Sequence, residues 1–192
     1  MVLQAGDVLD GKFQIEKCIA SGGMGEVYKG VDLDLSRPVA IKVLTKPSEE
    51  LTERFIREAQ SMAALDHPNI VPIYGIGLHE GDHYFVMKFV VGQTLETILK
   101  RQRLELDPPF EIEEVTALLC GTFRALDHAH RRGILHRDLK PGNIMIDANQ
   151  QPILMDFGIV KRLEDARVTQ TGVIFGTPQY MSPEQAMGQE QT

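Results

Sequence analysis

Cysteine is scarce in this chain, and no long run of apolar residues is present. The two cysteines, Cys18 and Cys120, form neither a CxxC pair nor a secreted-type disulfide framework, so we expect both to be reduced packing residues of a cytosolic protein. The best apolar run, YFVMKFVV, is short and contains Lys88, which excludes a membrane span from this stretch. No basic residue precedes Lys12, so the N-terminus does not resemble a signal peptide.

Positive charge is also in deficit. The chain has 20 lysines and arginines against 27 aspartates and glutamates, which gives a net charge of −7. An acidic chain of this kind has no overall attraction for nucleic acid or anionic lipid, so any phosphate must be bound by locally placed groups. With 192 residues, 43% of them hydrophobic, the chain can bury one good core or form two small lobes that share a cleft.

The first half of the chain is dominated by short alternating runs of apolar and polar residues, which are typical of antiparallel strands. The pattern predicts strands at 13–20, 26–33, 37–45, 70–78 and 83–90. Between the third and fourth runs the apolar spacing changes to three and four, which predicts a helix with Ser48 as its N-cap that ends at the HPN segment, 67–69. The first half is therefore predicted to be a small antiparallel sheet with one helix.

The second half is predicted to be mainly helical. Its longest apolar stripe needs a partner face and consists of Val115, Leu118, Leu119, Phe123 and Leu126. Gly133 is expected at the C′ position that ends this helix. The IMI and ILM runs on either side of DANQQP predict a short hairpin, and the chain from Ile159 onward is predicted to be mostly loop. We expect two lobes, residues 1–90 and 91–192, with the boundary near 88–93.

A glycine cluster, IASGGMGEV at 19–27, lies between the first two predicted strands. Glycines in such a turn let backbone N–H groups approach an anion closely, because no Cβ blocks the approach. The same composition is common in ordinary hairpin turns, so this segment alone does not establish an anion site.

A lysine on the third strand, Lys42, follows Ala40 on the same face of the predicted sheet. A small residue followed by a cation on one face could bind a ligand that has a flat apolar ring and a phosphate group. The alternative is that this lysine is an ordinary solvated residue at a strand edge. On the predicted helix, Glu58 shares a face with Phe55 and Met62, so its carboxylate points toward the sheet and needs a cation. Lys42 could be that cation, and the alternative is a glutamate at the edge of a solvated face.

Polar residues are unusually dense in GILHRDLKPGNIMID at 133–147, where they lie between two apolar runs. Here the sequence resembles the eukaryotic-type serine/threonine protein kinases, and most closely their bacterial members. The family's catalytic-loop pattern, His-Arg-Asp-Leu, three residues and Asn, is met by His136 through Asn143. Its Asp-Phe-Gly is Asp156-Phe157-Gly158, and its Ala-Pro-Glu is present as Ser182-Pro183-Glu184.

The resemblance extends from about residue 11 to the end of the chain. It makes Lys42 the strand lysine, Glu58 the helix glutamate, and 20–27 the glycine loop, with Ala20 in place of the first glycine. It implies a two-lobed α+β kinase fold, with an antiparallel sheet plus one helix in the N-lobe and a mainly helical C-lobe. Because the chain ends eight residues after Glu184, we expect that C-lobe to be incomplete here.

The resemblance also implies roles for the polar residues. Asp138 would orient the attacking hydroxyl and accept its proton, and Lys140 would lie near the transferring phosphate. Asn143 and Asp156 would hold Mg²⁺, with Mn²⁺ as an alternative metal. ATP would be bound by a larger set: Ile19, Ala20, Ser21, Gly22, Gly23, Met24, Gly25, Val27, Ala40, Lys42, Glu58, Lys88, Val90 and Met145. An internal hydrophobic column would be formed by Met62, Ile73, His136 and Phe157.

Threonines after the Asp-Phe-Gly motif are candidates for regulation. Thr169 and Thr171 lie where bacterial members of the family autophosphorylate, and each phosphate could pair with Arg137. Thr177 would face the substrate hydroxyl. The alternative is that these residues are ordinary loop threonines.

Two classes of function remain open on the sequence alone. The first is a kinase that phosphorylates serine or threonine in protein substrates, including its own activation segment. The second is a nucleotide-binding but catalytically impaired module that acts as a regulator or scaffold, and a small-molecule kinase is a more distant third. We expect self-association, no nucleic-acid partner and no membrane segment in this chain, and a cytoplasmic location, either alone or as the cytosolic part of a membrane-anchored parent.

Overall fold

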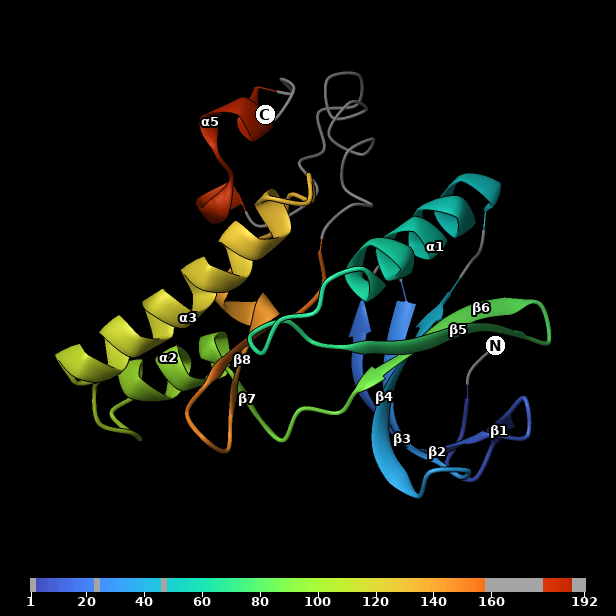
Figure 1. The fold of residues 1–192 in the computed structure, drawn as a ribbon. Helices are drawn as coiled ribbons and strands as arrows, with labels where there is room; N and C mark the ends of the chain where they lie inside the picture. The colour runs from blue at the N-terminus through green and yellow to red at the C-terminus, as the bar shows by residue number, and fades with distance from the viewer. Residues whose placement is uncertain (1–2, 23–24, 46–47, 158–177, 188–192) are drawn as a thin grey trace. The chain divides into compact units, whose positions relative to one another are not determined.

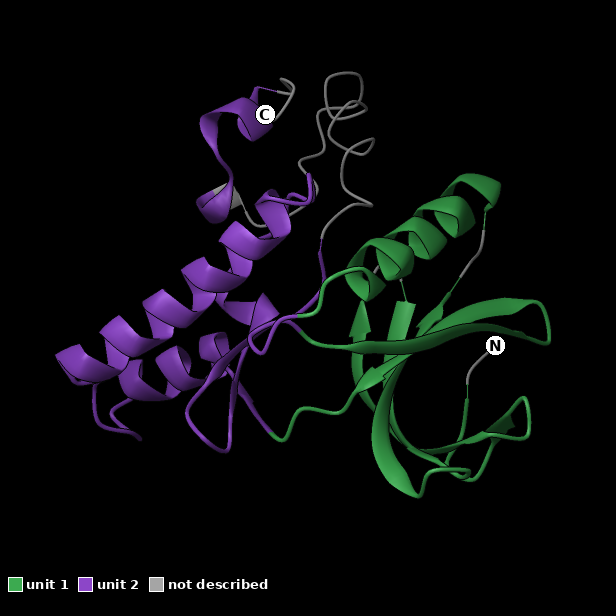
Figure 2. Cartoon of the chain, in the orientation of Figure 1, with its two compact units in different colours: residues 1–66, 71–91 green, residues 67–70, 92–192 purple. Residues whose placement is uncertain are grey.

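The computed structural model describes residues 3–22, 25–45, 48–157 and 178–187. Two compact units divide the chain, with residues 1–66 and 71–91 in unit 1 and residues 67–70 and 92–192 in unit 2 (Figure 2).

The short segment 67–70 belongs to unit 2 because its backbone and side chains bond to that unit. Ile70 forms a parallel bridge with Leu154, whose N–H donates to Asn69 O at 2.8 Å. The Asn69 side chain donates in turn to Pro152 O at 2.7 Å. The sequence had predicted that residues 67–69 end a helix and that Ile70 starts a strand.

Unit 1 contains a six-stranded antiparallel sheet of order β1-β2-β3-β4-β6-β5 (Figure 1). The strands are β1 (Val8–Leu9), β2 (Phe13–Gly22), β3 (Gly25–Asp32), β4 (Arg37–Leu44), β5 (Ile73–His79) and β6 (Asp82–Lys88). The five strands predicted from alternation are confirmed, while β1 has two residues and is too short to give a pattern. The fifth strand in sequence order, β5, starts after Pro72, because proline has no N–H to donate to a ladder.

Both faces of β4 are buried. Val39, Ile41 and Val43 lie in a core cluster with Tyr28 and with Leu9 of the N-terminal segment, as the alternation predicted. The opposite face is covered by the helix α1 (Glu49–Ala63), on which the Phe55 ring lies 5.0 Å from the Phe85 ring of β6, between centroids.

The start of α1 is fixed by the predicted N-cap. Ser48 has an extended backbone, and its side-chain oxygen accepts a hydrogen bond from Leu51 N at 3.2 Å. Glu49 and Glu50 lie in the first turn, where a negative charge is favourable. The buried face of α1 includes Phe55, Glu58 and Met62, so the prediction that Glu58 faces the sheet is confirmed.

Among its described residues, unit 2 contains three α-helices and a small three-stranded sheet of order β7-β8-β9. Its elements are β7 (Gly92–Thr94), α2 (Leu95–Arg103), α3 (Ile112–His130), the 3-10 turn η1 (Pro141–Asn143), β8 (Ile144–Asp147), β9 (Pro152–Leu154), the 3-10 turn η3 (Pro178–Tyr180) and α5 (Pro183–Ala186). The predicted hairpin is confirmed as β8 and β9, whereas the sequence did not predict β7. Within the described ranges, no helix is long and apolar enough to cross a membrane.

Gly133 ends the turn that follows α3. Its φ is +71°, its N–H donates to His130 O at 2.9 Å, and Ile134 N donates to Ala129 O at 3.0 Å. This pair of bonds around a glycine of positive φ is a Schellman pattern, which confirms the predicted C′ glycine.

The face of α3 that is buried differs from the apolar stripe. Its buried residues are Gly121, Thr122, Ala125 and Ala129. A Cβ at Gly121 would lie 2.7 Å from Pro152 Cγ, so short side chains let this helix approach β9 closely. The stripe is left largely in solvent, with Val115, Leu119 and Phe123 38, 44 and 59% exposed.

The cysteines were also wrongly assigned as packing residues. Both are free, as expected, but both are exposed. Cys18 lies in the exposed second half of β2, and Cys120 lies on α3 three residues before the exposed Phe123.

The exposed α3 face, defined here as Val115, Leu119 and Phe123, should drive self-association. Each large apolar side chain left in water forgoes roughly 1.5–3 kcal/mol of burial free energy. We therefore expect the double variant Leu119→Glu, Phe123→Glu to shift the purified chain toward monomer in light scattering. The control Leu106→Glu, at an exposed leucine outside this face, should not shift it. A monodisperse wild-type monomer would contradict the prediction.

Candidate active site

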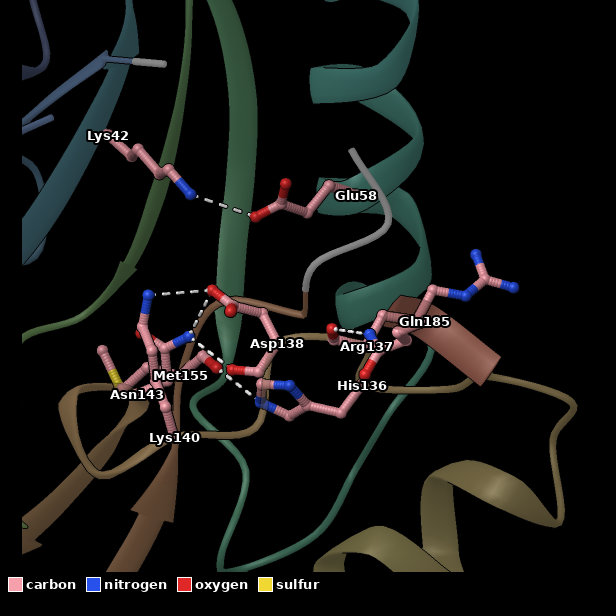
Figure 3. Close-up of polar contacts among 9 residues, drawn as sticks. All are labelled: Lys42, Glu58, His136, Arg137, Asp138, Lys140, Asn143, Met155 and Gln185. Atoms are coloured by element: carbon pink, nitrogen blue, oxygen red, sulfur yellow. Dashed lines mark hydrogen bonds and ion pairs between the residues drawn. The ribbon is translucent and has the colours of Figure 1, made fainter. Parts of the chain in front are cut away.

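One group of predicted site residues forms a buried ion pair within unit 1. Lys42 Nζ on β4 lies 3.0 Å from Glu58 Oε1 on α1, and the two side chains are only 14 and 4% exposed (Figure 3). Lys42 Nζ also lies 5.5 Å from the centroid of the Phe85 ring. The pairing predicted from the sequence is confirmed, whereas the use of Lys42 on phosphates remains a prediction.

Cross-strand pairing places further predicted residues on the same side of the sheet as Lys42. Val27 lies opposite Lys42, and Lys29 lies opposite Ala40, and directly paired residues of antiparallel strands share a face. Val27 and Ala40 therefore lie next to Lys42, with Ala40 buried and Val27 half-buried.

The glycine hairpin is closed by close backbone packing. β2 and β3 remain paired as far as Gly22 and Gly25, so the alanine at position 20 does not prevent the strands from meeting there. A Cβ at Gly25 would lie 2.2 Å from Val43 O, which leaves room only for glycine. Ile19, Ala20 and Ser21 are exposed on β2, while Gly23 and Met24 lie outside the described residues.

Two predicted backbone positions follow the sheet. Lys88 ends β6, and its N–H donates to Pro72 O at 3.0 Å. Val90, two residues on, is 8% exposed. Met145 belongs to unit 2, where it lies half-buried on β8 opposite Ile153.

Another group of predicted site residues forms a polar cluster within unit 2, centred on the Asp138 carboxylate (Figure 3). Asn143 Nδ2 donates to Asp138 Oδ2 at 3.0 Å and to Asp138 O at 2.8 Å. Lys140 Nζ lies 3.1 Å from the same Oδ2. Because both amide hydrogens of Asn143 are used on Asp138, its Oδ1 is the atom that can serve a metal ion.

A short turn brings these three residues together. Pro141 starts η1, and Asn143 N donates to Lys140 O at 2.9 Å. Asn143 is 7% exposed, so its amide is held within the unit rather than in solvent. The sequence predicted these residues by motif, and the turn explains how a spacing of five residues returns Asn143 to Asp138.

His136 anchors the catalytic loop to Met155, which follows β9 and precedes Asp156. Its Nε2 lies 3.0 Å from Met155 O, so this nitrogen carries the hydrogen and donates. Its ring packs on the Phe157 ring with 4.6 Å between centroids, and both residues are buried. Burial lowers the pKa of His136 below its ordinary value, which favours the neutral imidazole.

The backbone is strained at two positions of the motifs. Arg137 and Asp156 have φ values of +58° and +40°, in the left-handed region that non-glycine residues rarely adopt. Such conformations cost of the order of 1–3 kcal/mol each and tend to occur at active sites. Met155 N donates to Asn143 O at 2.9 Å, so the segment before Asp156 is tied to the catalytic loop through its backbone.

The two residues predicted to hold a metal ion carry oxygen donors. Asn143 Oδ1 and the Asp156 carboxylate are hard donors, and Mg²⁺ is typically bound by one or two such side chains together with phosphates and waters. Among the described residues, no group of three or more His, Cys, Asp or Glu could hold a metal ion by itself.

Several predicted positions lie outside the described residues. They are Thr169, Thr171 and Thr177, together with Gly158 of the Asp-Phe-Gly motif.

The sequence did not predict two residues of unit 2 that bond to the catalytic loop, Met155 and Gln185. Met155 acts through its backbone carbonyl, so its side chain gave no signal. Gln185 donates from Nε2 to Arg137 O at 2.7 Å, a contact across 48 positions of sequence that no local pattern could indicate. The Ser-x-x-Gln spacing of Ser182 and Gln185 could have predicted a capping box, which the structure contains.

Comparison with known proteins identifies the family to which this chain belongs. The family model described as the protein kinase domain matches residues 13–192. The chain belongs to the protein kinase family. Its curated relatives include the serine/threonine-protein kinase PknA of Mycobacterium tuberculosis, 42% identical over 97% of this chain, and PrkC of Bacillus subtilis, 40% identical over 95%.

Solved kinase structures agree with the fold. PpkA-294 in its apo form matches with a TM-score of 0.79 and 28% identity, over 96% of this chain and 71% of that one. The PknI kinase domain of M. tuberculosis matches with a TM-score of 0.75 and 28% identity, over 98% of this chain and 68% of that one. The kinase chain described here spans 44% of PknA and 28% of PrkC.

Proposed function

We propose that this kinase chain transfers the γ-phosphoryl group of ATP to serine and threonine hydroxyls of proteins, including its own activation segment. The observation that carries the proposal is the convergence of Asn143 and Lys140 on the carboxylate of Asp138. Relatives that are serine/threonine-protein kinases support the same chemistry.

Asp138 is assigned the role of general base. Its carboxylate is held by an N–H of Asn143 and by the Lys140 ammonium, so it is oriented before a substrate arrives. The substrate hydroxyl oxygen bonds to the γ-phosphorus, the bond from that phosphorus to the β,γ-bridging oxygen breaks, and the hydroxyl proton passes to Asp138. ADP leaves with the electron pair of the broken bond. Lys140 offsets negative charge on the transferring group.

Asn143 and Asp156 are assigned to Mg²⁺, with Mn²⁺ as an alternative. A divalent ion bound there supplies charge neutralisation for the phosphates. The hydrogen bonds from Asn143 to Asp138 fix the amide so that Oδ1 keeps one orientation.

Lys42 is assigned to the α- and β-phosphates, with Glu58 holding its ammonium in place. We assign the rest of the nucleotide to Ile19, Ala20, Ser21, Gly22, Gly23, Met24, Gly25, Val27, Ala40, Lys88, Val90 and Met145. Support for this set is the family match and, for Val27 and Ala40, their place beside Lys42 on the sheet.

Regulation is assigned to Thr169 and Thr171, and Thr177 to the approach of the substrate hydroxyl. Each phosphate would add about −1.5 to −2 charges, which suits the guanidinium of Arg137. Free cysteines are typical of a reducing compartment, and we place this kinase in the cytosol, alone or as part of a membrane-anchored parent.

The alternative of a catalytically impaired regulatory module is less well supported. The residues that the chemistry needs, namely Lys42, Glu58, Asp138, Asn143 and Asp156, are all present. The relatives matched over nearly the whole of this chain are themselves protein kinases.

Nucleotide binding and phosphotransfer test the proposal together. In calorimetry, Mg²⁺ should strengthen ATP binding to the wild-type chain, and Asp156→Ala should remove most of that gain because a metal ligand is lost. Wild type should incorporate phosphate from ATP into a serine/threonine substrate only when a divalent ion is present. The control Asp127→Ala, at an exposed aspartate paired with Arg131, should behave as wild type. Equal ATP affinity in all conditions would remove the metal assignment.

A further inference from the structure

A glutamine on the last described helix contacts the catalytic loop. Gln185 lies on α5, a helix of four residues, and its Nε2 donates to Arg137 O at 2.7 Å (Figure 3). That carbonyl belongs to the peptide group that joins Arg137 to Asp138. The contact therefore acts on the backbone directly before the proposed general base.

The orientation of the Gln185 amide is determined at both ends. Its Oε1 accepts a hydrogen bond from Ser182 N at 3.0 Å, and Ser182 Oγ accepts from Gln185 N at 3.3 Å. Because Gln185 Oε1 accepts from Ser182 N in the helix cap, the Nε2 amino group must point to the Arg137 carbonyl, which accepts its hydrogen bond. One side chain thus joins the start of α5 to the catalytic loop.

The peptide that Gln185 contacts is part of a strained turn. Asp138 N donates to His136 O at 2.8 Å, which closes a three-residue turn around Arg137, and Arg137 has a φ of +58°. A three-residue turn with a positive φ at its centre is the rare, strained form. Strained backbone persists only where its surroundings hold it, and Gln185 bonds to the central residue of this turn.

We propose that Gln185 is a positioning residue for Asp138. Its hydrogen bond holds the Arg137–Asp138 peptide in the orientation that places the Asp138 carboxylate against Asn143 and Lys140. The inference rests on the proposed function, because it assigns the bond a consequence for phosphotransfer. It also gives the segment around α5 a direct connection to the catalytic loop that does not pass through a nucleotide.

The Gln185→Glu variant isolates this role from helix capping. A glutamate keeps an oxygen to accept from Ser182 N, but it presents a second oxygen to the Arg137 carbonyl, where a donor is needed. Ser182→Ala gives the opposite change, since it removes the capping hydroxyl and leaves the Gln185 amide. Gln102→Glu is a matched control, because Gln102 Nε2 on α2 donates to Pro108 O at 2.8 Å, also from a glutamine to a backbone carbonyl.

Steady-state phosphotransfer to a serine/threonine peptide is measured for wild type and for the three variants Gln185→Glu, Ser182→Ala and Gln102→Glu. We expect Gln185→Glu to lower kcat by about tenfold to a hundredfold, since small misplacements of a catalytic group have effects of that order. The KM for ATP should change by less than about twofold, because no nucleotide contact is altered. Gln102→Glu should match wild type, and Ser182→Ala should lower kcat by much less than Gln185→Glu.

Wild-type kcat in Gln185→Glu, or an equal loss in Ser182→Ala, would overturn the inference in favour of capping alone. If the wild-type chain itself transfers no phosphate, the proposed function fails, and the backbone amide resonance of Asp138 then tests the inference. We expect that resonance to move in Gln185→Glu and to stay in place in Gln102→Glu. An unmoved Asp138 amide in Gln185→Glu would overturn the positioning role independently of activity.

Discussion

Asp138→Asn is expected to abolish phosphotransfer while leaving ATP affinity nearly unchanged. Asparagine has almost the same shape, and its amide oxygen can still accept from Asn143 Nδ2 and Lys140 Nζ, but it cannot take up the substrate proton. General-base groups contribute about 10²–10⁴ to rate, so kcat should fall by at least that lower value. Radiolabel transfer and calorimetric ATP titration measure the two quantities separately.

Asp127→Asn is the matched control for this substitution. Asp127 lies on α3, 59% exposed, with its carboxylate 3.0 Å from Arg131. The same chemical change there should leave kcat at the wild-type value. Continued autophosphorylation of Asp138→Asn at Thr169 or Thr171 would contradict the role assigned to Asp138.

Lys42→Met is expected to remove both activity and a large part of the stability of unit 1. The substitution leaves the carboxylate of Glu58, on a side chain 4% exposed, without the ammonium now 3.0 Å away. Removing one partner of a buried ion pair typically costs about 3–5 kcal/mol. Urea unfolding measures this loss, and phosphotransfer should fall with it because the assigned phosphate ligand is gone.

A second substitution separates stability from function. The double variant Lys42→Met, Glu58→Leu should recover much of the stability, since well-packed apolar residues often replace a buried ion pair at little cost, yet it should remain inactive. Arg57→Met is the control, because Arg57 and Glu53 form an ion pair on the same helix with side chains 69 and 61% exposed. Exposed pairs of this spacing contribute about 0.3–0.5 kcal/mol, so its effect should be small. Equal instability of the single and double variants would show that the buried carboxylate is not the cause.

The predicted site residues of unit 1 and those of unit 2 differ in how much of their geometry the sequence predicted. The Lys42–Glu58 pair was predicted from strand alternation and helix periodicity, because each pattern states which way a side chain points. Asp138, Lys140 and Asn143 were predicted from a motif, and the structure adds that a 3-10 turn brings all three to one carboxylate. The contact of Gln185 with Arg137 had no sequence signal, since it depends on where α5 lies in the folded unit.

The sequence by itself determined the type and order of most elements and the residues that carry the chemistry. Alternation, helical spacing and the N-cap Ser48 are local properties, so they predicted five strands and α1 with small errors at the ends. Only the tertiary structure decided which face of α3 is buried and where residues 67–70 belong. Helical periodicity shows which residues share a face, but the shape of the partner selects the face, and Pro152 on β9 admits Gly121 rather than the larger residues of the apolar stripe.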